Sequence, residues 1–244
     1  MAAYGNMDKG LPGELVGLTN THQIDSRLAK GAVPFGGLCF GTGDGEQVTA
    51  KGDGALLGIA ARTALDTPEY VDGDTVNVCR TGKIFGTAGE AVSADAEVSV
   101  NGSTGKIIAK TSAANGAKRT VTITLSGTSA ASKVVTVVVG DKVAQVNTTN
   151  DVKAAADVAA ALKTAIDALD IPFVATVSSA VVTLTAKDKG AAANDIAVTG
   201  STTDSTQTVT VANGTSGSDV VLNPGWFARS TAEAANDLVI VDLG

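Results

Sequence analysis

The sequence predicts a mainly β protein: a small barrel-like or sandwich-like domain, split in the chain by an inserted domain with one helix. Apolar residues make up 44% of the 244 residues but aromatic residues only 3%, which suits many short strands of small β-branched residues. Turn sequences recur over the first half of the chain at intervals of about 8–12 residues, as in barrels and sandwiches. One stretch alone has helical periodicity, and strand-like segments flank it on both sides.

Residues 1–24 are predicted to form an extended N-terminal arm. Their apolar residues come in two pieces interrupted by glycine, LPG at 11–13 and LVGL at 15–18, and no period is sustained. A segment that cannot bury a face of its own is either disordered or laid over a partner.

Short strands are predicted over 25–113, separated by turns such as Gly43-Asp44-Gly45 and Asp72-Gly73-Asp74. In GAVPFGGLCFGTGDGE (31–46), Gly36-Gly37 permits a bulge or a close backbone approach, and 41–45 form a turn. Residues 216–244 end on the apolar stretch LVIVDL, which we expect to pair with the strands of 25–113. Residues 25–113 plus 216–244 are thus expected to form one β domain.

Residues 114–215 are predicted to be an inserted β-β-α-β-β domain. The stretches AKRTVTITLS and KVVTVVVG alternate with period two, as half-buried strands do. The following stretch, 150–170, places its apolar residues on one helical face, and PFVATVSS and AVVTLTAK form a second pair of strands. Insertion at a surface turn is well tolerated where the ends of the insert meet.

Charge and hydropathy exclude two classes of partner. The formal charge is −7, and the longest basic cluster is Lys118-Arg119, interpreted as a solvated strand end, so we expect no nucleic-acid partner. No apolar run reaches the length of a membrane span, so we expect no membrane partner. No signal-peptide pattern is present; we expect use without secretion, with Cys39 and Cys79 reduced.

The sequence predicts no catalytic, cofactor-binding or metal site, and therefore a protein that is not an enzyme. The glycine pattern at 41–45 lacks the helix and the Gly-Lys-Ser/Thr that a phosphate-binding loop needs. The turn carboxylates do not have the spacing of a calcium loop. His22, the single histidine, has no acid cluster beside it, and neither cysteine has a histidine within its strand.

Four blocks of sequence carry a resemblance to a known family. They are VPFG at 33–36, LGIA at 57–60, GDTVNV at 73–78 and LVIVDL at 238–243. In this order they resemble the capsid cement (decoration) proteins of tailed bacteriophages. The insert, through DVAAALKTAID and VVTLTAKDKGAAANDI, is similar to the small α/β module of phage tail-sheath and other virion proteins.

The resemblance implies a structural virion protein that binds the outer surface of the major capsid lattice and stabilises the head. It implies synthesis in the host cytoplasm, self-association as a homotrimer or less commonly a dimer, and an insert that projects outward. We expect contacts with the major capsid protein or a neighbouring subunit at Tyr4, Leu11, Leu15, Leu18, Phe35 and Trp226.

Two other functions stay open from the sequence. A tail or baseplate component would use the sheath-like module for ring assembly. A module that adsorbs the virion to host carbohydrate is the third reading, although Trp226, Tyr4 and Tyr70 are few aromatic side chains for a sugar platform.

Overall fold

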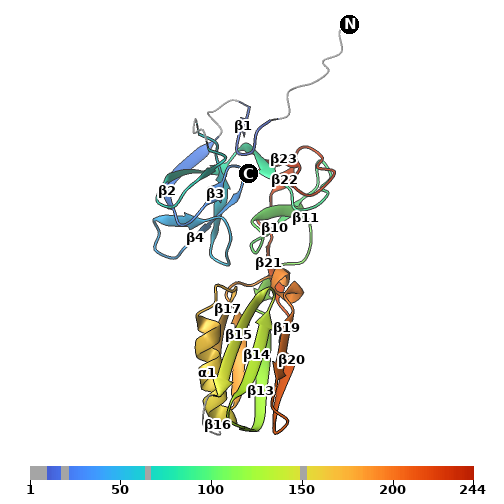
Figure 1. Ribbon diagram of the computed structural model, residues 1–244. Coiled ribbons are helices and arrows are strands. Elements are labelled where there is room, and N and C mark those ends of the chain that lie inside the picture. Colours follow the sequence, from blue (N-terminus) through green and yellow to red (C-terminus); the bar gives the residue numbers. More distant parts are fainter. Residues whose placement is uncertain (1–9, 18–21, 64–66, 149–152) are drawn as a thin grey trace. The chain divides into compact units, whose positions relative to one another are not determined.

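A computed structural model describes residues 10–17, 22–63, 67–148 and 153–244 (Figure 1). These residues fall into two compact units, each with its own hydrophobic core: unit 1, up to residue 115 together with 219–244, and unit 2, residues 116–218. The boundaries drawn from the sequence, 113/114 and 215/216, remain a prediction about which segments fold on their own. The mainly β class is confirmed, because strands dominate both units.

A closed five-stranded barrel forms one half of unit 1. Its order is β2-β5-β4-β6-β8, and the strands are β2 (Gln23–Ala29), β4 (Leu38–Gly41), β5 (Gln47–Thr49), β6 (Leu56–Ala60) and β8 (Thr75–Thr81). Strands β4 and β5 pair antiparallel through Phe40–Thr49 and Gly41–Val48, which confirms the hairpin predicted around 41–45. Beside the barrel, β3 (Val33–Pro34) pairs with β7 (Glu69–Tyr70).

Two small sheets make up the other half of unit 1. The first has the order β1-β9-β23-β22, with β1 (Leu15–Val16), β9 (Lys83–Thr87), β22 (Phe227–Ala228) and β23 (Leu238–Asp242). The second has the order β11-β10-β21-β12, with β10 (Val98–Asn101), β11 (Lys106–Ala109), β12 (Ala114–Ala117) and β21 (Ser218–Leu222). The closing strand β23 pairs with β9 over five residues, as the sequence predicts for LVIVDL.

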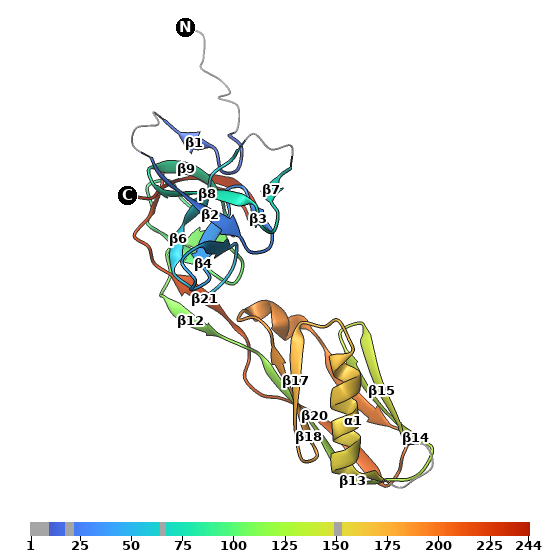
Figure 2. The same cartoon turned by 90° about the vertical axis from the view of Figure 1, so that its left-hand side faces the viewer.

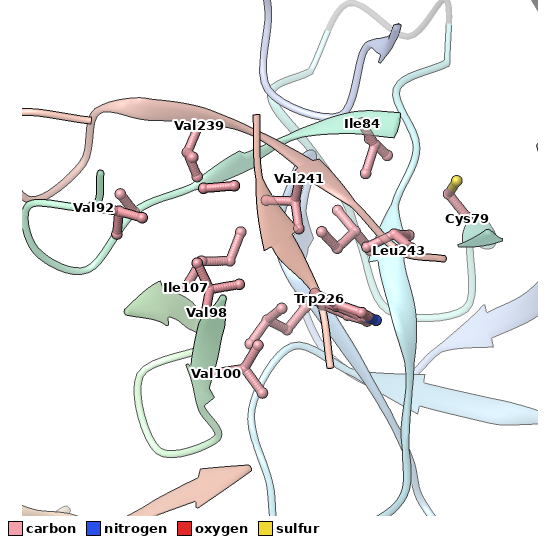
Figure 3. Packing of buried hydrophobic residues seen from close by; sticks show 14 of the residues in the cluster. Cys79, Ile84, Val92, Val98, Val100, Ile107, Trp226, Val239, Val241 and Leu243 are labelled. Carbon is pink, nitrogen blue, oxygen red and sulfur yellow. The ribbon is translucent and has the colours of Figure 1, made fainter. Parts of the chain in front are cut away.

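Barrel strands β4 and β6 bury side chains on both of their faces. Cys39 and Ala60 belong to one cluster with Val76 and Val78, whereas Leu38, Phe40 and Ile59 belong to a second cluster. That second cluster joins the barrel to the two small sheets through Ile84, Val98, Trp226 and Val241 (Figure 3). Burial on both faces explains why these strands read as continuous apolar runs rather than alternating ones.

The N-terminal arm is corrected for the described part of residues 1–24. Residues 15–16 form β1 on the edge of β9, and residues 23–24 begin barrel strand β2. The apolar pieces looked too short to bury a face of their own, but backbone pairing to distant strands anchors them instead. Residues 1–9 and 18–21 lie outside the described residues.

Unit 2 consists of strands with one α-helix lying along one side of them (Figures 1 and 2). One sheet has β17 (Phe173–Ser178), β18 (Val181–Ala186), β13 (Thr120–Ser129) and β20 (Gln207–Asn213) in that spatial order, and β16 (Lys153–Ala154) pairs with the far end of β13. The other has the order β15-β14-β19, with β14 (Lys133–Val139), β15 (Lys142–Thr148) and β19 (Val198–Thr202). A short 3-10 helix, η2 (Ala191–Asp195), precedes β19.

Helix α1 (Ala155–Asp167) buries Val158, Ala159, Leu162 and Ile166 in the core of unit 2, and it packs against β13, β15, β17 and β18. The predicted helix over 150–170 is therefore confirmed in kind but too long at both ends. Residues 153–154 are taken up by strand β16. The β-β-α-β-β order is incomplete, because β15, β16, β19 and β20 add four strands to it.

No helix among the described residues is both long and apolar enough to cross a membrane.

Candidate interaction surfaces

The segment 10–17 is held to unit 1 by backbone hydrogen bonds. Gly13 N donates to Phe85 O at 2.8 Å, Phe85 N donates to Glu14 O at 2.9 Å, and Arg62 N donates to Gly13 O at 2.7 Å. Gly36 makes this approach possible: a Cβ there would lie 2.8 Å from both Gly13 N and Phe85 O, and its φ is +71°. The predicted close approach at Gly36 is confirmed, and the segment that approaches it is the N-terminal one.

Six contact residues were predicted from the sequence, and four of them lie in the described part of the chain. Of these four, Leu11 is the one at the surface. Leu11 is 50% exposed, and Leu15 is half-buried against the core of unit 1. Phe35 and Trp226 are core residues, 2% and 7% exposed. Tyr4 and Leu18 lie outside the described residues.

The burial of Phe35 and Trp226 has a specific structural role. The Phe35 ring meets the Tyr70 ring edge-on with centroids 5.0 Å apart, and the Arg62 guanidinium lies 5.1 Å from its centroid. Trp226 lies among Val98, Val100 and Leu243 in Figure 3. Both side chains are thus used inside unit 1 and leave little surface for a partner.

Strand β2 presents an apolar outer face that the sequence analysis did not identify. Ile24 and Leu28 are each 43% exposed, and Ser26 between them is also exposed. In its sequence, QIDSRLA, polar and apolar residues alternate, but the charged residues are on the side that is usually apolar. Asp25 pairs with Val78 and Arg27 with Val76, and both valines are buried in the barrel. We call Ile24, Ser26 and Leu28 the β2 face.

The charges behind the β2 face are paired. Asp25 lies 2.8 Å from the Arg80 guanidinium and 3.7 Å from that of Arg27. The Arg27 guanidinium also donates to the backbone carbonyl of Gly45 at the tip of the first hairpin. Such half-exposed ion pairs add about 1 kcal/mol or less to stability, but they leave the β2 face without a free charge among its described neighbours in β8.

The glycine-rich turn 41–45 satisfies its own polar groups. The Asp44 carboxylate accepts hydrogen bonds from the backbone N–H of Glu46 and Gln47 at 3.0 and 2.9 Å and from the Thr42 hydroxyl at 2.9 Å. These bonds, those of the backbone first, lower the pKa of Asp44. The carboxylate thus stabilises the hairpin as a local turn. Across the described ranges no group of three His, Cys, Asp or Glu side chains could hold a metal ion.

Both cysteines are buried free thiols. Burial raises the pKa of Cys39 to about 12 and that of Cys79 to about 11. Because the thiolate is the form that acts as a nucleophile or metal ligand, these two thiols are unreactive in both respects at neutral pH.

The basic pair Lys118-Arg119 requires a correction. Arg119 is 7% exposed, and its guanidinium donates to Ala193 O at 2.7 Å, Ile196 O at 2.5 Å and Asn213 Oδ1 at 2.8 Å. It ties β13 to the loop around η2 and is not a solvated strand end. Its acceptors lie 74 or more residues away in the chain, so no local pattern reveals them.

A family model described as "Structural cement protein (E217 gp24/Pam3 gp6)", a phage cement family, matches residues 2–140. The match begins near the N-terminus and takes in β13 and β14 of unit 2, but it does not include the closing segment 219–244. No curated protein matches the sequence. Because the matched range covers more than half of the 244 residues, the chain belongs to the phage structural cement protein family.

Proposed function

We propose that this protein binds the outer surface of the major capsid lattice of a tailed phage through unit 1 and stabilises the head as a non-enzymatic cement. Membership of the cement family is the observation that carries the proposal. The matched range includes β1 to β12 of unit 1. The virion is accordingly its proposed place of action, after synthesis in the host cytoplasm.

The proposed contact surface in unit 1 consists of the β2 face and Leu11. A single exposed leucine on a protein surface is ordinary, but Ile24 and Leu28 project on the same side of one strand, and the charges behind them are paired. Removing such side chains from water is favourable by about 25 cal/mol per Å² of apolar surface, from which the entropic cost of association is subtracted. The major capsid protein is the partner to which we assign this surface.

A cement protein can hold a lattice through many weak contacts that are repeated from site to site. Once one of several linked copies is bound, the next copy meets its site at a high effective concentration, so the weak contacts add up to tight binding. We therefore propose that several copies act together on the capsid. The homotrimer implied by the family resemblance remains the prediction for unit 1, with a dimer as the alternative.

Capsid binding is tested by co-sedimentation of the purified protein with expanded capsids that lack it. The double variant Ile24→Lys/Leu28→Lys places two desolvated charges in the proposed contact, and we expect its occupancy at a fixed concentration to fall at least tenfold. Val143→Lys, on an equally exposed valine of unit 2 (48% exposed), is the matched control and should bind like the wild type. Unchanged occupancy of the double variant would exclude the β2 face as the contact.

The contribution of the N-terminal segment needs a carefully placed truncation. Removing residues 2–25 would delete β1 and the start of β2 and so damage the barrel itself. Deleting residues 2–9 leaves the bonds of Gly13 and Glu14 in place, and we expect it to weaken capsid binding. Purified protein that forms rings or tubes in electron micrographs, and does not bind capsids, would instead favour a tail component.

A further inference from the structure

The outer face of one sheet in unit 2 carries hydroxyl side chains and no charged ones. Successive side chains of a strand lie on opposite faces, and directly paired residues of antiparallel strands share a face. The registers of β17, β18, β13 and β20 therefore place thirteen side chains on the side opposite the core and helix α1. They are Val174, Thr176 and Ser178; Val181, Thr183 and Thr185; Thr120, Thr122, Thr124 and Ser126; and Thr208, Thr210 and Ala212. We call these thirteen residues the threonine face.

The threonine face is open to solvent. All of its side chains are exposed or partly exposed, whereas the residues between them, such as Val121, Ile123 and Leu184, are buried in the core of unit 2. The sequence shows the same division, because threonine alternates with apolar residues in TVTITLS, VVTLTA and TQTVTVA. Eight threonines and two serines thus form one surface.

Many of the hydroxyls on this face are available to a partner. Thr122 and Thr176 donate long bonds of 3.4 Å to backbone carbonyls of the neighbouring strands. Within the described residues, the hydroxyls of Thr124, Thr183 and Thr210 make no hydrogen bond. These three threonines lie on β13, β18 and β20, so available hydroxyls extend across the sheet.

The charge of unit 2 favours an uncharged partner. Residues 116–218 contain eight lysine and arginine residues, eight aspartates and no glutamate, so unit 2 is formally neutral, and no residue of the threonine face is ionisable. A charged group brought onto this face would lose hydration without meeting an opposite charge. The phosphates of nucleic acid and of anionic lipids need basic side chains, which the face does not have.

The residue types of the threonine face are poor anchors for a protein partner. Residues that dominate the energy of protein interfaces are enriched in tryptophan, tyrosine and arginine, whereas serine, threonine and valine are under-represented among them. The face consists of threonine, serine, valine and alanine alone. Neither a second copy of this chain nor a segment of a capsid protein would find a large side chain or a guanidinium there.

We propose that the threonine face binds a neutral polysaccharide. A threonine hydroxyl both donates and accepts hydrogen bonds, as the hydroxyls of a sugar do, and the threonine methyl groups can contact the C–H groups of a sugar ring. The side chains repeat at about 4.8 Å between strands and about 7 Å along each strand, so one chain of linked sugars can meet several hydroxyls. The aromatic residues Trp226 and Tyr70 are buried in unit 1, and the hydroxyls of unit 2 take the place of an aromatic platform.

This kind of binding depends on repetition. Each hydrogen bond between two hydroxyls contributes little net free energy, because water competes for both groups. A single copy should therefore bind a short oligosaccharide weakly. A long polymer that crosses many fixed copies binds far more tightly, because each further contact is made at a high effective concentration.

Retention of polysaccharides on an array of the full chain tests the proposal. The protein is immobilised at high density on a sensor and exposed to dextran, mannan and galactan, with dextran sulfate as the charged counterpart of dextran. We expect at least one of the neutral polymers to bind, with an apparent affinity at least tenfold higher than that of dextran sulfate. Failure of all three neutral polymers to bind, or equal binding of dextran sulfate, would overturn the proposal.

A pair of matched variants locates the binding surface. Thr124→Val/Thr183→Val removes two available hydroxyls and keeps two β-branched side chains suited to strands, so the circular dichroism spectrum should be unchanged. We expect at least tenfold weaker retention of the neutral polymer. Thr136→Val/Thr199→Val, on the outer face of the sheet β15-β14-β19, is the control and should bind like the wild type. An equal affinity of the first variant and the wild type, or an equal loss in both variants, would contradict the assigned face.

The β2 face variant distinguishes this inference from the capsid-binding proposal. Ile24→Lys/Leu28→Lys should lower capsid occupancy and leave polysaccharide retention unchanged, so either proposal can fail without the other. Thr124→Lys/Thr183→Lys should leave capsid occupancy and the mass of the free protein in analytical ultracentrifugation unchanged. If it lowers either one, the threonine face contacts a capsid protein or a second copy, and its assignment to a polysaccharide is wrong.

Discussion

Units 1 and 2 are both built mainly from strands, but they deal with the edges of their sheets in opposite ways. In unit 1 the longest strands have seven residues, and five strands close into a barrel. In unit 2, β13 runs for ten residues, and both sheets are open: β17 and β20 end one sheet, and β15 and β19 end the other. The closed barrel uses its backbone hydrogen bonds internally, so the barrel of unit 1 makes contacts through side chains. An open edge leaves backbone groups available for pairing.

The two cores are chemically distinct as well, which makes the comparison measurable. Trp226, the single tryptophan, belongs to the core of unit 1. Its fluorescence therefore reports unfolding of unit 1, whereas far-ultraviolet circular dichroism reports both units. A change confined to one core should move one signal and not the other.

The largest effect is expected from Leu162→Ala in helix α1. Leu162 is fully buried in the core of unit 2, and truncation of such a leucine costs about 4 kcal/mol of unfolding free energy. Urea unfolding should show an earlier transition by circular dichroism with an unchanged fluorescence midpoint. If the fluorescence midpoint falls by the same amount, the two units unfold as one and the comparison fails.

The opposite pattern is expected from Gly36→Ala in unit 1. The new Cβ would lie 2.8 Å from two backbone atoms at a φ of +71°, and strain plus overpacking cost about 3 kcal/mol. The fluorescence midpoint should fall while the circular-dichroism signal of unit 2, which contains helix α1, is retained. Gly31→Ala is the matched control: its φ is +82° with nothing within 4 Å of the added atom, so it should cost about 1 kcal/mol.

A smaller effect, dependent on pH, is expected at Asp204 in unit 2. Hydrogen bonds from the backbone N–H groups of Thr206 and Ala130 and from the Thr206 hydroxyl lower the pKa of Asp204 from 3.8 to about 2. Because the folded pKa lies below the unfolded one, the stabilisation is complete above pH 4 and is lost as the pH falls toward 2. Asp204→Asn should lower the urea midpoint of unit 2 at pH 7. The difference from the wild type should narrow below pH 4, and a constant difference at all pH values would contradict the assignment.

The smallest effect is expected from Lys163→Ala. Lys163 forms an ion pair with Asp167 one helical turn away, and both side chains are over a third exposed. Pairs of this kind contribute about 0.3–0.5 kcal/mol, and added salt should remove the difference. The variant also serves as the surface control for Leu162→Ala on the same helix, and a loss approaching that of the core variant would show that α1 tolerates no change at all.

The two units also differ in how much of their structure could be predicted from the sequence. In unit 2 the period-two runs and the helical face gave β13, β14, β17, β18 and α1, because each element buries one face and its periodicity records which. Strand β15 carries polar Gln145 and Asn147 on its exposed face and was not predicted. Arg119 looked solvated because its carbonyl acceptors belong to distant segments.

In unit 1 the turns and the order of the four family blocks located the strands, but not what the strands pack against. The role of residues 10–17 was missed because it depends on backbone bonds to Phe85 and Arg62 rather than on an apolar period. The β2 face was missed because an alternating strand does not say which side is outside: in β2 the charged residues face inward and the apolar ones outward. Such an inversion is visible only once the barrel has closed.

The burial of Cys39 and Cys79 has a consequence for the life of a virus particle. A particle assembled in reducing surroundings is released at lysis into oxidising ones. Thiols that are enclosed and protonated neither exchange with glutathione nor join into disulfides. The protein therefore keeps the same covalent structure on both sides of that change, and oxidation does not alter the surface proposed to bind the capsid.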